Sequence, residues 1–131
     1  MSSMQYTSYF FVKNKQRNLA KDFLIKMSPN IYSKTIEQMK LLEKYGLDTS
    51  RVSIKKFQNG IWKIRTKDAS NNVRLFFYII DNHIYYLFGF YKSTQKTPEG
   101  MKIKINNLKN DLIKTINEVQ PNNEYFEKIK F

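Results

Sequence analysis

Residues 61–90 of the chain have the sequence IWKIRTKDASNNVRLFFYIIDNHIYYLFGF. Apolar and basic side chains alternate over the first six positions, with Lys63 and Arg65 on one side of the backbone, a pattern that is typical of a β-strand. Two runs rich in aromatic and β-branched residues follow at 73–80 and 84–90, and the Asp-Asn pair between them is typical of a tight turn. The stretch therefore predicts an antiparallel meander of three strands.

The sequence on either side of this meander predicts one further strand and three helices. Aromatic residues favour a strand at 6–12, and apolar residues at every fourth position indicate a short helix over 19–27. After a break at Ser28-Pro29, a second helix is expected to end at Gly46, and a third helix is expected over 101–116. The length of 131 residues fits one domain, residues 1–131, with a core at about 6–117 and a C-terminal tail at 118–131.

The positive charge of the chain points to a polyanionic partner. Lys and Arg number 23 against 11 Asp and Glu, which gives a formal net charge of +12. The stretch from Thr49 to Pro98 contains nine basic residues and only the acidic Asp68 and Asp81. Although an AT-rich genome also enriches Lys, an excess gathered in the middle of the chain favours a phosphate-binding surface.

Composition also excludes several classes of site. The chain has no Cys and one His, so a disulfide framework and a Cys- or His-based zinc site are excluded. The carboxylates are scattered, which disfavours a two-metal nuclease. We expect no metal and no cofactor. No signal peptide or membrane-spanning segment is apparent, so we expect a cytoplasmic protein that does not bind membranes.

Two arginines in the meander form the centre of the predicted site. A symmetric register of the first two strands places Arg65 opposite Arg74, although a slip by one residue would turn Arg74 toward the core. Like charges opposed across a sheet destabilise it, and a phosphate held between two guanidinium groups would offset that cost. The chain has nineteen Lys and four Arg, so the placement of two Arg here indicates a geometric need.

The third strand of the meander suggests aromatic contacts to RNA. The tight turn would set Gly89 beside Arg74, where a missing side chain could admit another backbone. Tyr85 and Tyr91 would share that face. Aromatic rings beside a basic strip can stack on bases, and we predict this role for Tyr91, whereas Tyr85 is interpreted as a half-buried residue of the sheet.

Three short motifs in order resemble those of a known family. They are GIWKIR at 60–65, VRLFF at 73–77 and FGFYKSTQKTP at 88–98. This pattern, within residues 6–115, resembles the phage-derived, HigB-like branch of the RelE/ParE toxin superfamily. Two positions depart from the family pattern: Lys63 stands where a Glu is usual, and Ser93 replaces the second of a pair of Lys.

The resemblance implies a fold, an activity and partners. The implied fold is α+β and RelE-like, with two N-terminal helices packed on a curved antiparallel sheet, the active face on the other side of the sheet, and a C-terminal helix. The implied activity is that of a type II toxin–antitoxin toxin, an endoribonuclease (mRNA interferase) that cleaves messenger RNA, often on the ribosome. The implied protein partner is a helix-turn-helix antitoxin of the HigA type that neutralises the toxin.

In metal-free RNA cleavage the substrate's own 2′-hydroxyl attacks the adjacent phosphate, and we expect particular residues to assist this reaction. Arg65 and Arg74 would bind the phosphorane oxygens, and Lys63 would accept the 2′-proton because neighbouring cations lower its pKa. Lys92 or Tyr91 would contact the leaving group. The remaining expected RNA-binding residues are Lys55, Lys56 and Lys96.

Two other functions remain compatible with the sequence. A non-catalytic RNA-binding module would keep the basic face and bind with steep salt dependence without cutting. An interaction protein could use a basic groove to hold an acidic peptide, as in an antitoxin tail. Growth arrest on induction would separate either from the toxin.

Overall fold

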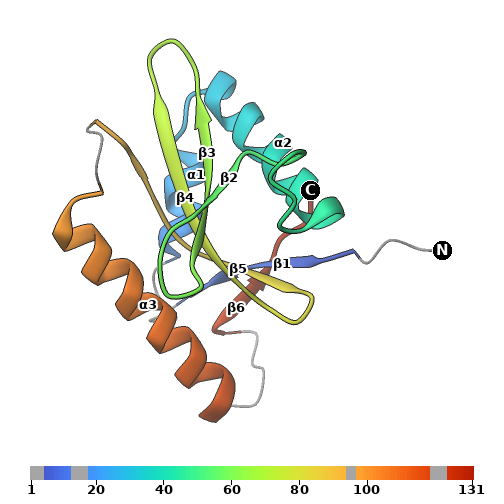
Figure 1. The fold of residues 1–131 in the computed structure, drawn as a ribbon, viewed down its shortest axis with the longest axis vertical. Helices are drawn as coiled ribbons and strands as arrows, with labels where there is room; N and C mark the ends of the chain where they lie inside the picture. Colours follow the sequence, from blue (N-terminus) through green and yellow to red (C-terminus); the bar gives the residue numbers. More distant parts are fainter. Residues whose placement is uncertain (1–4, 13–17, 94–96, 119–123) are drawn as a thin grey trace.

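The computed structural model describes residues 5–12, 18–93, 97–118 and 124–131. The chain forms three helices and six strands within these ranges (Figure 1). In chain order they are β1 (Thr7–Phe11), α1 (Leu19–Ile25), α2 (Pro29–Tyr45), β2 (Ile54–Lys56), β3 (Trp62–Lys67), β4 (Asn72–Ile80), β5 (His83–Tyr91), α3 (Glu99–Glu118) and β6 (Phe126–Lys128). The predicted end of the second helix is confirmed, since Gly46 caps α2 with a positive φ of 63°.

The six strands form one mixed sheet in the order β2-β3-β4-β5-β1-β6. The pairs β2–β3, β3–β4 and β4–β5 are antiparallel, which confirms the predicted meander and adds β2 to it. Strand β1 pairs with β5 in parallel, and β6 pairs with β1 antiparallel. The prediction of an antiparallel sheet is therefore wrong, because the alternation of residues reveals a strand but not the direction of the strand beside it.

The predicted arrangement of helices is also wrong. The strand predicted at 6–12 is confirmed as β1, so the N-terminal pair of helices that the resemblance implies is not found: β1 comes first, followed by a short α1 with seven residues and α2 with seventeen. Helix α1 contacts β5, α2 contacts β3, and both share a hydrophobic core on one face of the sheet. Helix α3 packs against the other face through Ile105, Leu108 and Leu112, so the sheet lies between α1 and α2 on one side and α3 on the other (Figure 1).

A buried hydrogen bond fixes β3 against α2. The hydroxyl groups of Thr35 and Thr66 lie 2.8 Å apart, and both residues are buried. Thr66 faces α2, so alternation along the strand turns Arg65 to the opposite face. The core on the α2 side thus determines which side of β3 carries the basic side chains.

Gly89 gives a stability prediction, because its missing side chain makes room for α1. A Cβ atom at Gly89 would clash with the ring of Phe23, well inside van der Waals contact. We expect Gly89→Ala to destabilise the fold by about 1–3 kcal/mol, the usual cost of overpacking. Urea denaturation measures the change. Gly100→Ala is the matched control, since a Cβ there meets nothing within 4 Å, and equal midpoints for the two variants would contradict the predicted clash.

Candidate functional site

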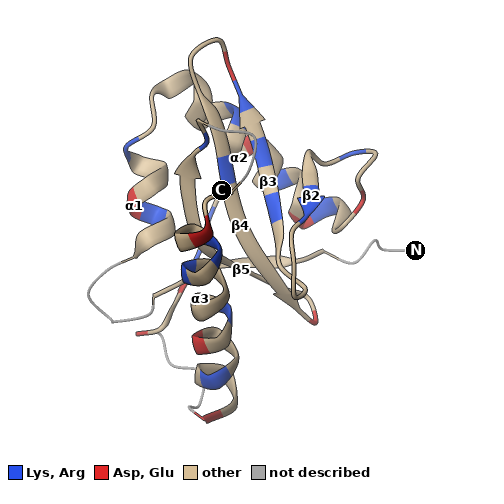
Figure 2. Ribbon diagram, turned by 60° about the vertical axis from the view of Figure 1, so that its left-hand side comes forward, with Lys and Arg blue, Asp and Glu red and all other residues tan. Residues whose placement is uncertain are grey.

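Five basic residues gather on the face of the sheet that α3 partly covers. Lys55 on β2 pairs with Lys63 on β3, and Arg65 on β3 pairs with Arg74 on β4, which confirms the predicted register of the two arginines. Lys92 follows β5, where its backbone N–H donates to the carbonyl of Asn72. These five side chains are called the cation cluster below, and Figure 2 shows basic residues along β2, β3 and β4.

No acidic residue neutralises the cation cluster within the part of the chain that the structure describes. The ion pairs there join Lys21 to Glu127, Arg51 to Asp48 and Lys102 to Glu99, all outside the cluster. Burial is the largest cause of the lowered pKa of both Lys63 and Arg74, and repulsion within the cluster, including that from Arg65, lowers both values further. A bound anion would relieve this repulsion.

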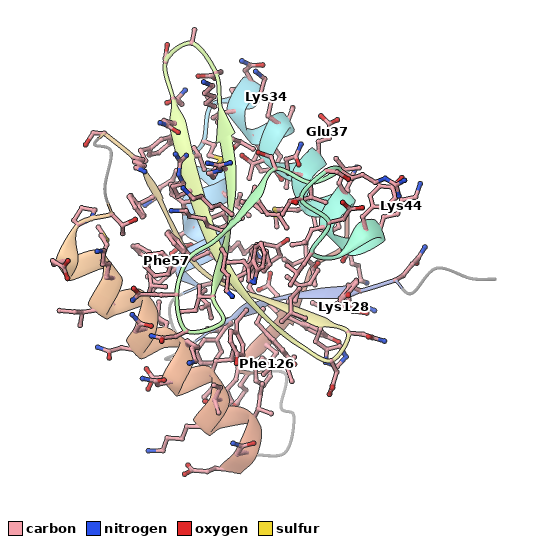
Figure 3. The ribbon with its side chains drawn as sticks, viewed as in Figure 1. Lys34, Glu37, Lys44, Phe57, Phe126 and Lys128 are labelled. Atoms are coloured by element: carbon pink, nitrogen blue, oxygen red, sulfur yellow. The ribbon has the colours of Figure 1, made fainter. Side chains whose placement is uncertain are left out.

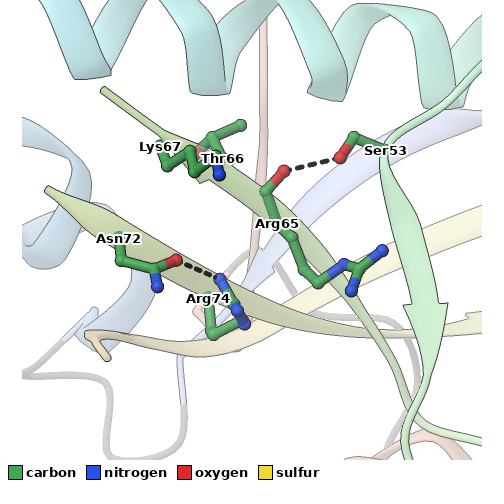
Figure 4. A pocket seen from close by; sticks show the side chains of 6 residues that line it. All are labelled: Ser53, Arg65, Thr66, Lys67, Asn72 and Arg74. Atoms are coloured by element: carbon green, nitrogen blue, oxygen red, sulfur yellow. Dashed lines mark hydrogen bonds between the residues drawn. The ribbon is translucent and has the colours of Figure 1, made fainter. Parts of the chain in front are cut away.

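Arg74 is the most constrained member of the cluster. Its side chain is only 9% exposed, and burial, followed by the charge of Arg65, lowers its pKa. One terminal nitrogen donates to Oδ1 of Asn72 at 2.6 Å and to the carbonyl of Val73 at 3.0 Å, as Figure 4 shows for Asn72. Its Nε is buried and has no hydrogen-bond partner among the described residues. A buried donor normally has a partner, so this N–H is an unsatisfied donor within the cation cluster.

A pocket of about 320 Å³ opens between the two arginines (Figure 4). Ser53 and Thr66 line one side of it, and Asn72 lines the other. The hydroxyl of Ser53 donates to the backbone carbonyl of Arg65 at 2.7 Å and so fixes the strand at that position, whereas Asn72 accepts from the guanidinium group of Arg74 and holds its N–H groups in place. Such fixed donors can stabilise an anion without reorganising.

Lys63 lies among aromatic rings and other cations. It is 8% exposed, and its Nζ lies 5.6 Å from the ring centre of Phe57 and 5.8 Å from that of Phe76. Burial, and then the positive charges of Lys92 and Arg74, lower the pKa of Lys63 to about 8. The Lys63 amine therefore gives up its proton much more readily than an ordinary lysine, and its neutral form, which can accept a proton, begins to appear near neutral pH.

The aromatic rings beside Lys63 form a continuous layer. Phe57, labelled in Figure 3, meets Phe76 edge to face at 5.1 Å, and Phe76 stacks on Phe90 at 5.8 Å. Phe90 in turn lies 6.4 Å from Phe88, over which Nζ of Lys104 sits at 4.6 Å. Sequence reasoning missed these residues, although Phe76 is two residues from Arg74 and therefore shares its face of the strand.

The predicted role of Tyr91 is not supported by its position. A bulge at Phe76/Phe77 shifts the β4–β5 register by one residue, so Arg74 pairs with Phe90 instead of Gly89. Tyr91 therefore faces α1, where its ring lies 5.2 Å from that of Phe23. Gly89 admits this same Phe23 ring, and the inference that it admits an RNA backbone was wrong.

The other predicted RNA-binding lysines have different outcomes. Lys55 belongs to the cation cluster, and its charge contributes to lowering the pKa of Lys63 and Lys92. Lys56 pairs with Trp62 and so points away from the cluster, because successive residues of a strand face opposite ways. Lys96 lies outside the described residues.

The family model for "Phage derived protein Gp49-like (DUF891)" matches residues 22–110, well over half of the chain. The chain belongs to this family. The Gp49-like family is associated with the toxins of toxin–antitoxin systems. The matched residues include β2 to β5, so the entire cation cluster lies within the Gp49-like region. No curated protein matches the chain, and no helix in its described ranges is long and apolar enough to cross a membrane.

Proposed function

We propose that this Gp49-like protein is the toxin of a type II toxin–antitoxin system and acts as a metal-independent endoribonuclease of the RelE/HigB type. The observation that carries the proposal is the pairing of Arg65 and Arg74 across β3 and β4, with the buried Nε of Arg74 lacking a partner among the described residues. Two guanidinium groups at adjacent strand positions match the oxygens of a phosphodiester.

The proposed reaction begins at Lys63. Its neutral amine accepts the proton of the 2′-hydroxyl, and the 2′-oxygen forms a bond to the adjacent phosphorus. Arg65 and Arg74 donate hydrogen bonds to the non-bridging oxygens, which gain charge in the phosphorane. Lys63 is suited to this role because its pKa of about 8 lies near the working pH.

The reaction ends at the leaving group. The bond from phosphorus to the 5′-oxygen breaks, and the ammonium group of Lys92 donates a proton to that oxygen. Burial, followed by the charge of Arg74, lowers the pKa of Lys92, which makes it a stronger acid than an ordinary lysine. The products are a 2′,3′-cyclic phosphate and a 5′-hydroxyl. In this proposal Lys55 and Lys96 hold the RNA backbone, and no step uses a metal ion or a cofactor.

The proposal extends to the setting of the reaction. Messenger RNA in the cytoplasm, free or on the ribosome, is the proposed substrate, and a helix-turn-helix antitoxin of the HigA type is the proposed inhibitor. The charge of the cation cluster, which no carboxylate of the described residues neutralises, supports a polyanionic substrate. The association of the Gp49-like family with toxins supports an antitoxin partner.

Cleavage in the presence of excess EDTA tests the proposed chemistry. We expect the purified protein to cut a labelled messenger RNA at an unchanged rate with EDTA, because arginines and lysines supply all the charge that the reaction needs. The 5′-hydroxyl and cyclic phosphate ends are identified by kinase labelling and mass spectrometry, with and without ribosomes. Arg65→Ala serves as the inactive control. Strict dependence on added magnesium, or RNA binding without cleavage in both settings, would contradict the proposal.

A further inference from the structure

A second surface lies on the opposite side of the sheet from the cation cluster. A groove of about 380 Å³ runs between α1, α2 and the end of the chain that includes β6. Phe10 of β1, Leu24 of α1 and Met39 of α2, all of them core residues, line it together with Ile129. These core residues pack on the face of the sheet that carries α1 and α2, whereas Lys63 contacts rings on the α3 face.

The groove collects apolar side chains that remain exposed. Of the six large apolar residues that are exposed among the described residues, three border it: Ile25 at 64%, Tyr32 at 40% and Phe131 at 42%. They come from α1, α2 and the segment after β6. Scattered single apolar residues are normal on a protein surface, but a group around one concave surface is typical of an interaction site.

The rim of the groove is positively charged. Lys40, Lys128 and Lys130 line it and have no ion pair among the described residues, and Figure 3 labels Lys128. Lys21 also lines the groove, and its Nζ lies 2.8 Å from Oε2 of Glu127, the single carboxylate residue in the lining. This one carboxylate is therefore already engaged. A ligand that complements this groove would therefore carry several carboxylates beside apolar side chains.

We propose that this groove binds an acidic amphipathic segment of a partner protein. Apolar side chains of the segment enter between α1 and α2, and its carboxylates lie on the lysine rim. A protein segment fits better than RNA because the floor of the groove is formed by aliphatic and aromatic core side chains, while Arg65 and Arg74, which have no ion pair among the described residues, lie on the other face. The proposal stands independently of RNA cleavage, and the partner would leave the cation cluster uncovered.

A designed peptide tests the groove. The probe is a fluorescein-labelled amphipathic peptide with Leu on one helical face and Glu on the other, beside a twin in which every Glu is Gln. We expect saturable binding of the Glu peptide, weakened by about tenfold or more in Ile25→Ser and in Lys128→Glu, which corresponds to about 1.4 kcal/mol. Fluorescence anisotropy measures the affinity, and RNA cleavage by Ile25→Ser should equal that of the wild type.

Matched variants separate the groove from general attraction to a basic protein. Leu47→Ser removes an apolar residue that is 42% exposed elsewhere, and Lys55→Glu makes the same charge change on the opposite face. Both should bind the Glu peptide as the wild type does. Equal weakening by Lys55→Glu and Lys128→Glu, or equal affinity for the Gln twin, would overturn the proposal.

Two further results would assign the groove to another occupant and also overturn the proposal. The first is a concentration-dependent dimer in analytical ultracentrifugation that Ile25→Ser abolishes, which would indicate a second copy of the chain. The second is binding of a single-stranded RNA oligonucleotide that Ile25→Ser weakens and Arg65→Ala does not. Loss of RNA cleavage alone, with peptide binding intact, would contradict only the proposed function.

Discussion

Replacing Arg74 by alanine is expected to lower the rate of RNA cleavage by about 100- to 1,000-fold, the usual cost of removing one fixed donor from an oxyanion site. Arg74 is held by Asn72 and by the carbonyl of Val73, so its guanidinium group has little freedom, and its buried Nε has no hydrogen-bond partner among the described residues. The same variant should relieve growth arrest when its expression is induced. Single-turnover cleavage of a labelled RNA and growth after induction measure the two effects.

Two further variants make the Arg74 result interpretable. Arg74→Lys keeps the charge but loses the planar fork, and we expect it to remain strongly impaired because an ammonium group cannot make the same paired contacts. Arg51→Ala removes an exposed arginine that contacts Asp48 and the ring of Tyr45, and it should cleave as the wild type does. Thermal melting confirms that each variant is folded. Full activity of a folded Arg74→Ala protein would remove the central residue of the proposed mechanism.

The alternation of apolar and basic residues at 61–66 predicts the position of the cation cluster on the sheet. Because the side-chain period of a strand is two, an apolar face that includes Ile64 requires Lys63 and Arg65 to share the other face. The short connection to β4 then placed Arg65 opposite Arg74, as the structure has it. A hydrophobic pattern and a short loop were sufficient because both act over a few residues.

The errors arose where pairing depends on distant parts of the chain. Strand β1 could be recognised, but its parallel pairing with β5 joins segments that lie far apart in the sequence, and α1 contacts both strands. The bulge at Phe76/Phe77 inserts one residue into β5 and moved Tyr91 to the α1 face. Neither a crossover nor a bulge leaves a local pattern, so the sequence alone assigned Tyr91 to the wrong side.

The same dependence on distant packing explains why the special environment of Lys63 could be predicted only in part. Neighbouring cations were expected from the strand pattern, but burial is the larger cause of its lowered pKa. The rings of Phe57 and Phe76 flank its Nζ, and sequence reasoning did not connect them with Lys63. Burial and the neighbouring cations thus act in the same direction, since both disfavour the charged form of the Lys63 amine and lower its pKa.

The rate of RNA cleavage is expected to rise about tenfold per pH unit below pH 8 and to level off above it, because Lys63 must be neutral to accept a proton. Burial and nearby cations disfavour the charged form of the Lys63 amine, so its pKa falls below the ordinary value. The neutral base therefore appears at lower pH than in an ordinary lysine. Lys92 must keep its proton, and its pKa also lies below the ordinary value. The rate should therefore fall again at high pH and give a bell-shaped profile.

Two variants test whether Lys63 causes the rising limb of that profile. Lys63→Arg stays protonated at every accessible pH, so we expect it to bind RNA with near wild-type affinity and to lose cleavage throughout the range. Lys55→Gln removes one of the cations that lower the pKa of Lys63, so the midpoint of the rising limb should move to higher pH while the limb persists. A rate that does not change between pH 6 and about 8, or a rising limb that survives in Lys63→Arg, would assign the base to another group. The shift in Lys55→Gln distinguishes a base embedded in the cation cluster from a lysine that only holds the substrate, because a residue that only positions RNA would change affinity without moving the midpoint.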